Sequence, residues 1–178
     1  MLLRTAPTHR LGADRLRAVR TLLDEAFEGD FSEDDWDHAL GGVHVWAEDE
    51  RGIAAHGAVV QRRLLHRGRS YRVGYVEGVA VRADLRRQGL GGAVMAELER
   101  IIEGTHHFGA LSASRAGAAL YRARGWWTWP GHIEVLTPSG TVRLAEEEGS
   151  VFLRPTPGRE RPDPAAALVF DWRDGDVT

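Results

Sequence analysis

The amino-acid sequence predicts a mixed α/β fold built around one strand–turn–helix unit. Helix-like stretches at the start of the chain are followed by three strand-like runs, and then helices and strands alternate. Only turn residues separate the three strand-like runs, which is the pattern of an antiparallel meander. The third run continues through a glycine-rich turn into an amphipathic helix, so this unit forms the centre of the predicted fold.

Two helices are expected before these strands. The first covers residues 13–27, with Asp14 as its cap and with apolar residues at helical spacing, namely Leu16, Val19, Leu22, Leu23 and Phe27. The second is short, covers residues 32–40, begins at Ser32 and ends at the pair Gly41-Gly42. The strands of the meander are expected at 43–49, 53–65 and 70–81, because turn residues stand between these runs.

The second half of the chain starts with the helix of the central unit. Apolar residues from Leu90 to Ile102 lie on one helical face, and Gly104 closes the helix. A strand over 108–114 and a short helix over 115–124 follow, and short strands and loops make up the remainder. We find no internal repeat and no break in composition, so residues 1–178 are expected to form a single domain.

Composition limits the possible functions. The chain has 178 residues, with 43% hydrophobic and 28% charged side chains, which is ordinary for a soluble protein. No apolar run approaches the roughly 20 residues that span a bilayer, and the start lacks the apolar core of a secretion signal, so no membrane partner and a cytoplasmic location are expected. A net charge of −3 argues against general nucleic-acid binding. Without cysteine or lysine, thiolate metal sites and Schiff bases are excluded.

The turn inside VRADLRRQGLGGAVMAELER, residues 81–100, is suited to an anion. A helix start carries unpaired N–H groups and partial positive charge, and glycines let a phosphate approach the backbone. Arg82, Arg86 and Arg87 could add charge-assisted contacts. The alternative is an ordinary glycine turn with solvated arginines. A Walker loop needs a lysine, and a dinucleotide fingerprint beginning at Gly89 fails at Val94.

The turn does fit the pattern Arg/Gln-x-x-Gly-x-Gly/Ala through Arg86, Gly89 and Gly91. In this pattern and in its place between strand and helix, the chain resembles the GNAT superfamily of acetyl-coenzyme A-dependent N-acetyltransferases. The resemblance implies a mixed, mostly antiparallel sheet, splayed at its centre and flanked by helices. It also implies that acetyl-CoA is bound by residues of the third strand, the turn and a later serine: Val79, Ala80, Val81, Arg86, Arg87, Gln88, Gly89, Leu90, Gly91, Gly92 and Ser114.

A narrower resemblance covers most of the chain from Gly29 onward. Segments such as GDFSEDDWDHALGG, GYVEGVAVRAD, LYRARGW and DWRDGDV are similar to actinobacterial aminoglycoside 2′-N-acetyltransferases. The resemblance implies acetylation of an aminoglycoside 2′-amine and suggests a homodimer. A polycationic acceptor calls for carboxylates, and the expected acceptor contacts are Asp30, Asp35, Glu77, Gly78, Ser112, Glu147 and Asp176. The acidic run around Asp35 could equally be a solvated helix start.

Two residues are expected to carry the chemistry. Glu77 stands in a strand of Val and Tyr, where a carboxylate must face a cavity or pair with a cation such as Arg72 or Arg82. Its functional interpretation is a general base for the ammonium substrate. The resemblance implies that Tyr121 protonates the departing thiolate, whereas its structural alternative is packing on Trp126.

The tail departs from the family pattern in two places. The acidic run before the strand near 150 is EEE where relatives often have aspartate, which weakens Glu147 as a ligand. The sequence ends at Thr178, where the resemblance implies an aromatic residue. We expect no metal site, because His106-His107 lack acidic partners at ligand spacing. Other amine acceptors, such as a polyamine or a cell-wall amino sugar, and a non-catalytic coenzyme A sensor remain open.

Overall fold

The computed structural model describes residues 1–114 and 117–178. The chain divides into two compact units, and each unit is assembled from two separate segments. The first unit consists of Met1–Val60 and Val76–Ile101, and the second of Gln61–Tyr75 and Ile102–Thr178. The sequence-based expectation of one domain over residues 1–178 stays a prediction, and the units are described in turn.

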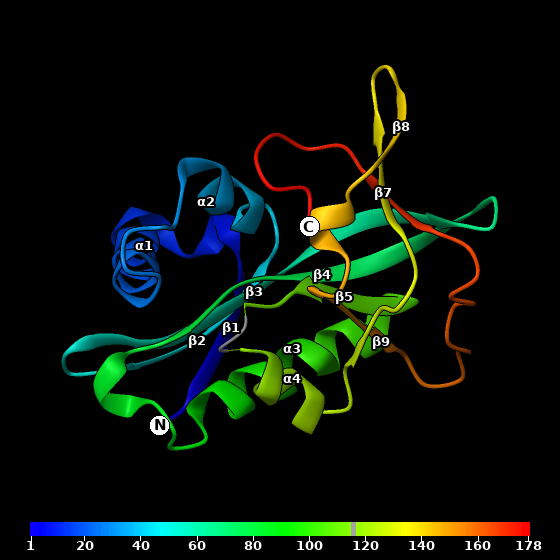
Figure 1. Ribbon diagram of the computed structural model, residues 1–178. Coiled ribbons are helices and arrows are strands. Elements are labelled where there is room, and N and C mark those ends of the chain that lie inside the picture. The colour runs from blue at the N-terminus through cyan, green and yellow to red at the C-terminus, as the bar shows by residue number, and fades with distance from the viewer. Residues whose placement is uncertain (115–116) are drawn as a thin grey trace. The chain divides into compact units, whose positions relative to one another are not determined.

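The first unit contains three helices and the strands of the predicted meander (Figure 1). Its strands are β1 (Leu3–Pro7), β2 (Val43–Asp49), the first part of β3 (Gly52–His66) and the last part of β4 (Arg69–Val81). β2 pairs antiparallel with β1 and with β3. The helices are α1 (Gly12–Ala26), α2 (Glu33–Ala39) and α3 (Leu90–Thr105), with short 3-10 turns at Thr8–Arg10 and Ala83–Leu85. The strand β1 was not expected from the sequence.

Local sequence explains the two N-terminal helices. Val19, Leu22 and Leu23 are buried on α1, as their spacing predicts. The helix begins after Leu11, however, and Asp14 lies in its first turn as the ion-pair partner of Arg17, so the prediction of Asp14 as the cap was wrong. At α2, by contrast, Ser32 is the N-cap of a capping box, as expected.

Helices cover both faces of the strands in this unit. On one face, α1 packs through Val19 and Leu23 into a cluster with Trp46 and Ile53. On the other face, α3 approaches β3 so closely at Gly57 that a Cβ atom there would lie 2.8 Å from Leu98 Cδ1. A side chain at this position would have to displace Leu98, so the glycine lets the side chains of α3 pack directly on β3.

The second unit is dominated by strands. Their order in the sheet is β6-β9-β5-β4-β3-β10-β7-β8. Among the pairings with a described register, β4–β5 and β7–β10 are parallel and the others antiparallel. The sheet is therefore mixed and mostly antiparallel, as predicted. The bounds are β5 Phe108–Ser112, α4 Ala118–Ala123, β6 Trp127–Thr128, β7 Ile133–Thr137, β8 Gly140–Arg143, a 3-10 turn Ala145–Glu147, β9 Val151–Pro155 and β10 Leu168–Asp171.

The pairing between β4 and β5 is short. It runs from Val73 opposite Phe108 to Tyr75 opposite Ala110, although β4 continues to Val81. The described register therefore gives the last six residues of β4 no partner on β5. None of the helices in the described ranges has the length and apolar character needed to cross a membrane.

Candidate functional site

At the beginning of the turn after β4, Arg82 forms ion pairs that stabilise the turn. The guanidinium of Arg82 contacts Asp49 at 2.6 Å and Asp84 at 2.8 Å, and these hydrogen bonds raise its own pKa. They also hold the pKa of the Asp49 carboxyl at about 2, well below its usual value. Arg82 is thus committed to two carboxylates, which gives it a structural role in place of the anion contact considered from the sequence.

The next residues leave the turn open. Arg86 is exposed, and its Nε donates to the carbonyl oxygen of Val81 at 3.1 Å. Gln88 donates to the carbonyl of Asp84, also at 3.1 Å. Arg87 and Gly89 adopt left-handed backbone conformations, with φ of 62° and 84°, and no atom lies within 4 Å of a Cβ built on Gly89. Gly89 therefore adopts the left-handed conformation without steric strain, and its lack of a side chain leaves space above the turn.

Helix α3 presents its positive end to this space. Ala93 makes the first backbone bond of the helix, to the carbonyl of Gly89 at 3.0 Å. The amides of Leu90, Gly91 and Gly92 precede that bond and are the unpaired donors of a helix start. The first turn holds no acidic residue that would compete for them. Together with two exposed arginines, this arrangement fits a phosphate or pyrophosphate.

Glu77 and Gly78 lie on β4 just before this turn. The Glu77 side chain is half-buried. Gly78 has φ of 55°, an unusual value within a strand, and a Cβ on it would touch Leu23 of α1 at 3.4 Å. Its carbonyl oxygen lies 2.8 Å from His56 Nδ1. The glycine thus places a local distortion in β4 beside the predicted general base.

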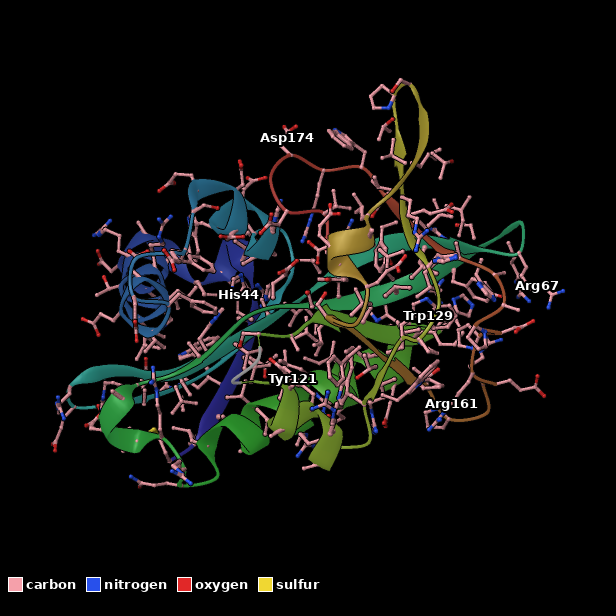
Figure 2. All side chains as sticks on the ribbon, in the orientation of Figure 1. His44, Arg67, Tyr121, Trp129, Arg161 and Asp174 are labelled. Atoms are coloured by element: carbon pink, nitrogen blue, oxygen red, sulfur yellow. The ribbon has the colours of Figure 1, made fainter. Side chains whose placement is uncertain are left out.

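Behind Gly78, two fully buried histidines continue this contact. His56 Nε2 lies 2.9 Å from His44 Nδ1, and His44 Nε2 lies 2.8 Å from the Thr8 hydroxyl. Figure 2 labels His44, on β2. Burial lowers the pKa of both histidines, and the neighbouring His44 lowers that of His56 further, so both are neutral at pH 7. The sequence analysis did not single out this series of hydrogen bonds from Thr8 through His44 and His56 to Gly78.

The acidic segment around α2 is only partly available to a ligand. Asp35 accepts hydrogen bonds from the backbone N–H and the hydroxyl of Ser32, both at Oδ2 and both 2.8 Å long. Glu33 pairs with Arg20 at 2.9 Å. Asp30 is exposed. Of the two predicted contacts, Asp30 therefore offers a solvent-facing carboxylate, and Asp35 already acts as a cap.

Two hollows lie in the first unit. The larger, about 610 Å³, runs between α1 and α2 and is lined by Leu16, Arg17, Arg20, Asp24, Glu33 and Trp36 among others. Arg20 forms ion pairs with both Asp24 and Glu33, and Arg17 also lines this hollow, so its lining carries charges of both signs. The smaller, about 260 Å³, lies beside the turn after β4 and includes Val81 and Arg86.

In the second unit, Tyr121 lies on α4 (Figure 2). It is buried, and its ring contacts those of Trp126 and Phe152, with centroids 6.4 and 6.1 Å away. Packing on Trp126, the structural alternative weighed from the sequence, is therefore present. Burial raises the pKa of the phenol to about 12, so the hydroxyl keeps its proton at neutral pH.

Two of the other predicted acceptor contacts of this unit, Ser112 and Glu147, belong to one hydrogen-bond network. Ser112 donates to Ser150 at 3.2 Å. The Ser150 hydroxyl donates to the Glu147 carbonyl oxygen at 2.7 Å and also lies 3.1 Å from the Glu147 carboxylate. The buried Thr178 donates to the same carboxylate oxygen at 2.6 Å. Asp176 is exposed, and its carbonyl accepts from Arg173 at 2.8 Å. The network brings Ser112 and Glu147 together, and its bond to Thr178 holds the C-terminal residue in place.

Ser114 is exposed and accepts a hydrogen bond from the backbone N–H of Gly117 at 3.2 Å. The predicted helix start at Arg115 lies outside the described residues, and α4 is described from Ala118. Within residues 1–114 and 117–178, no group of histidine and acidic side chains is arranged to hold a metal ion.

The turn after β4 lies inside a region that matches a known protein family. Residues 8–128 match the family of acetyltransferase (GNAT) domains. This chain belongs to the GNAT acetyltransferase family. Over 176 residues it is 46% identical to an aminoglycoside 2′-N-acetyltransferase of Mycolicibacterium fortuitum, a match that covers 98% of this chain and 90% of that protein.

Solved GNAT-like structures confirm the fold. The chain is similar to the GNAT family N-acetyltransferase YhbS from Escherichia coli in complex with CoA, with a TM-score of 0.62 and 16% identity over 95% of this chain and 88% of that one. An acyl-CoA N-acyltransferase from Pseudomonas aeruginosa gives 0.60 and 17% over 86% and 98%. Eis1 from Mycobacterium abscessus gives 0.62 and 17% over 75% of this chain, which spans only 33% of Eis1.

Proposed function

We propose that this GNAT acetyltransferase transfers the acetyl group of acetyl-CoA directly to the 2′-amine of aminoglycoside antibiotics, and thereby gives resistance to them. One observation carries the proposal: 46% identity over nearly the whole chain to a protein named for that activity. The position of Glu77 on β4 just before the turn is consistent with it, as is the cradle, by which we mean the turn and helix start from Arg86 to Gly92.

Acetyl-CoA would be held by the end of β4 and the turn after it. The pyrophosphate would lie over the amides of Gly89 to Gly92, with charge from Arg86 and Arg87. The backbone of Val79, Ala80 and Val81 would meet the pantetheine arm, because β4 has no described β5 partner there. Ser114 remains a proposed coenzyme contact.

The chemistry would use one base and one acid. Glu77 accepts a proton from the substrate ammonium, which frees the nitrogen lone pair. The nitrogen attacks the thioester carbonyl, a C–N bond forms, the C–S bond breaks, and the nitrogen loses its second proton to solvent to give the neutral amide. Tyr121 gives its proton to the departing thiolate and regains one from solvent. The amine attacks directly, and no acetyl-cysteine can form, since the chain has no cysteine.

The acceptor would be bound by polar groups from several elements. Asp30 offers a solvent-facing carboxylate, and Asp35 could contribute Oδ1, because both of its described hydrogen bonds end on Oδ2. Glu147 and Ser112 are proposed as a linked pair, and Gly78 and Asp176 as further contacts. These groups suit a cation rich in hydroxyls, since carboxylates attract the ammonium groups and hydroxyls exchange hydrogen bonds.

An acceptor panel tests the proposal. Release of coenzyme A thiol from acetyl-CoA is measured with tobramycin, which has a 2′-amine, and with kanamycin A, which has a 2′-hydroxyl. We expect turnover with tobramycin alone, and an acetyl group on N2′ in the NMR spectrum of the product. Turnover with both would refute the 2′ assignment. Acetyl-CoA binding without turnover for any aminoglycoside would favour another amine acceptor or a coenzyme A sensor.

The glycine at the turn gives a sharper test of coenzyme binding. Gly89→Val places a β-branched side chain at φ of 84°, a strain of roughly 1–3 kcal/mol that the turn can relieve by leaving its cradle conformation. We expect the KM for acetyl-CoA to rise about tenfold. Gly158→Val is the matched control, because φ is 77° there and Gly158 also has open space around it. Equal effects of both substitutions on the KM for acetyl-CoA would contradict the proposal that this turn binds the pyrophosphate.

Narrower expectations remain proposals with their own support. A homodimer rests on family resemblance alone, and a cytoplasmic location rests on the sequence. The expectation that the protein does not bind nucleic acid rests on its net charge of −3. The single GNAT domain over residues 1–178 is supported by a family match that draws on both units, since residues 8–128 include parts of each.

A further inference from the structure

The buried contacts behind Gly78 have a defined direction. A carbonyl oxygen can only accept, so the contact of 2.8 Å requires the proton of His56 to be on Nδ1. Neutral His56 then has a lone pair on Nε2, which accepts from His44 Nδ1–H at 2.9 Å. His44 Nε2 in turn accepts from the Thr8 hydroxyl. One tautomer of each histidine satisfies every contact.

The start of the chain is consistent with this direction. The Thr8 hydroxyl also lies 3.2 Å from the carbonyl of Gly42, but that carbonyl already accepts the Thr8 backbone N–H at 3.1 Å. The contact with His44 Nε2 is shorter, at 2.8 Å, and because that nitrogen carries no proton in this tautomer, the hydroxyl is the donor. Because burial lowers the pKa of both rings, the neutral forms that the chain requires are the ones present at pH 7. All the donors point from Thr8 toward Gly78.

The direction of the Gly78 carbonyl fixes a second group. In a trans peptide the C=O of one residue and the N–H of the next point in opposite directions, and the structure contains no cis peptide among its described residues. The Gly78 carbonyl is turned toward His56, so the Val79 N–H is turned away from it. Gly78 can adopt the required φ of 55° because it lacks a Cβ.

We propose that His44 and His56 are positioning residues for acetyl transfer: their hydrogen-bond chain holds the Gly78–Val79 peptide so that the Val79 N–H faces acetyl-CoA. The inference rests on the proposed binding of acetyl-CoA along the end of β4. Neither histidine touches the substrate, and each acts through the backbone beside Glu77.

Binding measurements on three variants test the proposal. His56→Leu removes the donor to Gly78, whereas His56→Asn keeps a donor near the place of Nδ1. His66→Leu is the matched control, because His66 is buried on β3 and its Nδ1 lies 3.1 Å from a carbonyl, that of Ala167, far along the chain from Gly78. Calorimetry gives the Kd for acetyl-CoA and for 3′-phospho-ADP, the half of the coenzyme that reaches only the turn.

We expect His56→Leu to weaken acetyl-CoA binding about tenfold and to change the 3′-phospho-ADP Kd less than twofold, a difference that one lost hydrogen bond explains. His56→Asn should recover most of the affinity, and His66→Leu should match the wild type. Unchanged acetyl-CoA binding in His56→Leu, or equal losses for both ligands, would overturn the positioning role. If His56→Leu does not fold, His44→Leu replaces it.

The tautomers supply a measurement on the wild-type protein itself. Imidazole ¹⁵N spectra should show both histidines neutral and protonated at Nδ1, and a His56 protonated at Nε2 would refute the proposal. Failure of the proposed function would look different. A wild type that does not bind acetyl-CoA refutes both proposals, whereas a wild type that acetylates tobramycin with variants of equal affinity refutes only the role of the histidines.

Discussion

Replacing Glu77 by glutamine should lower kcat for tobramycin acetylation about 100-fold or more and leave the Kd of acetyl-CoA unchanged. Glutamine keeps the shape of the half-buried side chain but cannot accept the ammonium proton, and a positioned base contributes roughly 10²- to 10⁴-fold. Steady-state kinetics across the pH range, together with calorimetry of acetyl-CoA binding, check the expectation.

The control for this change is Glu134→Gln, which alters another half-buried strand glutamate, on β7, and should leave kcat near the wild-type value. Wild-type turnover by Glu77→Gln at every pH would exclude Glu77 as the base. A parallel loss of acetyl-CoA affinity would instead indicate that Glu77 supports the fold of β4, since a base that acts only on the amine has no part in coenzyme binding.

Replacing Tyr121 by phenylalanine should lower kcat by about 10- to 100-fold, because the variant cannot protonate the departing thiolate. The ring contacts with Trp126 and Phe152 survive the change, so the thermal unfolding temperature should fall little. Kinetics and a thermal melt of the same preparation measure both quantities. Tyr71→Phe, at a half-buried tyrosine of β4, serves as the control for loss of a phenol.

The high pKa of Tyr121 adds a pH criterion. The phenol keeps its proton at every pH below about 12, so it remains an acid over the working range of an enzyme. If the wild-type rate changes with pH anywhere below about pH 10, the titrating group must be a group other than Tyr121. The same pH dependence should therefore persist in Tyr121→Phe. Loss of that pH dependence in the variant, or unchanged kcat, would contradict the acid role.

Much of the fold could be predicted because its signals are local. The strand 43–49 has the predicted bounds, and Ser32 caps α2 through contacts within four residues. Failures arose where tertiary contacts decide. Leu3–Pro7 has exposed Arg4 and Thr5 and becomes a strand only by pairing with β2. Asp14 looked like a cap, yet the helix starts two residues earlier at the left-handed Gly12.

The candidate site divides in the same way. The turn from Arg86 to Gly92 could be read from glycine spacing, since a backbone cradle depends on adjacent residues. The commitment of Arg82 to Asp49 could not, because the two residues are far apart in sequence. The two histidines stand among small apolar residues in predicted strands, which was a signal for burial. Their alignment with Gly78 depends on three separate segments, and no single-sequence pattern records it.

The interleaved segments of the two units have a consequence for folding during synthesis. Residues 61–75 leave the ribosome before Ile101 completes the first unit, yet they belong to the second. In the finished sheet this hairpin lies between β5 and β10, and β10 is made only at Leu168–Asp171. At about 5–20 residues per second, the hairpin edges stay unpaired for several seconds, which is an opportunity for strand addition by another nascent chain. Chaperone binding during translation would therefore matter most for this hairpin.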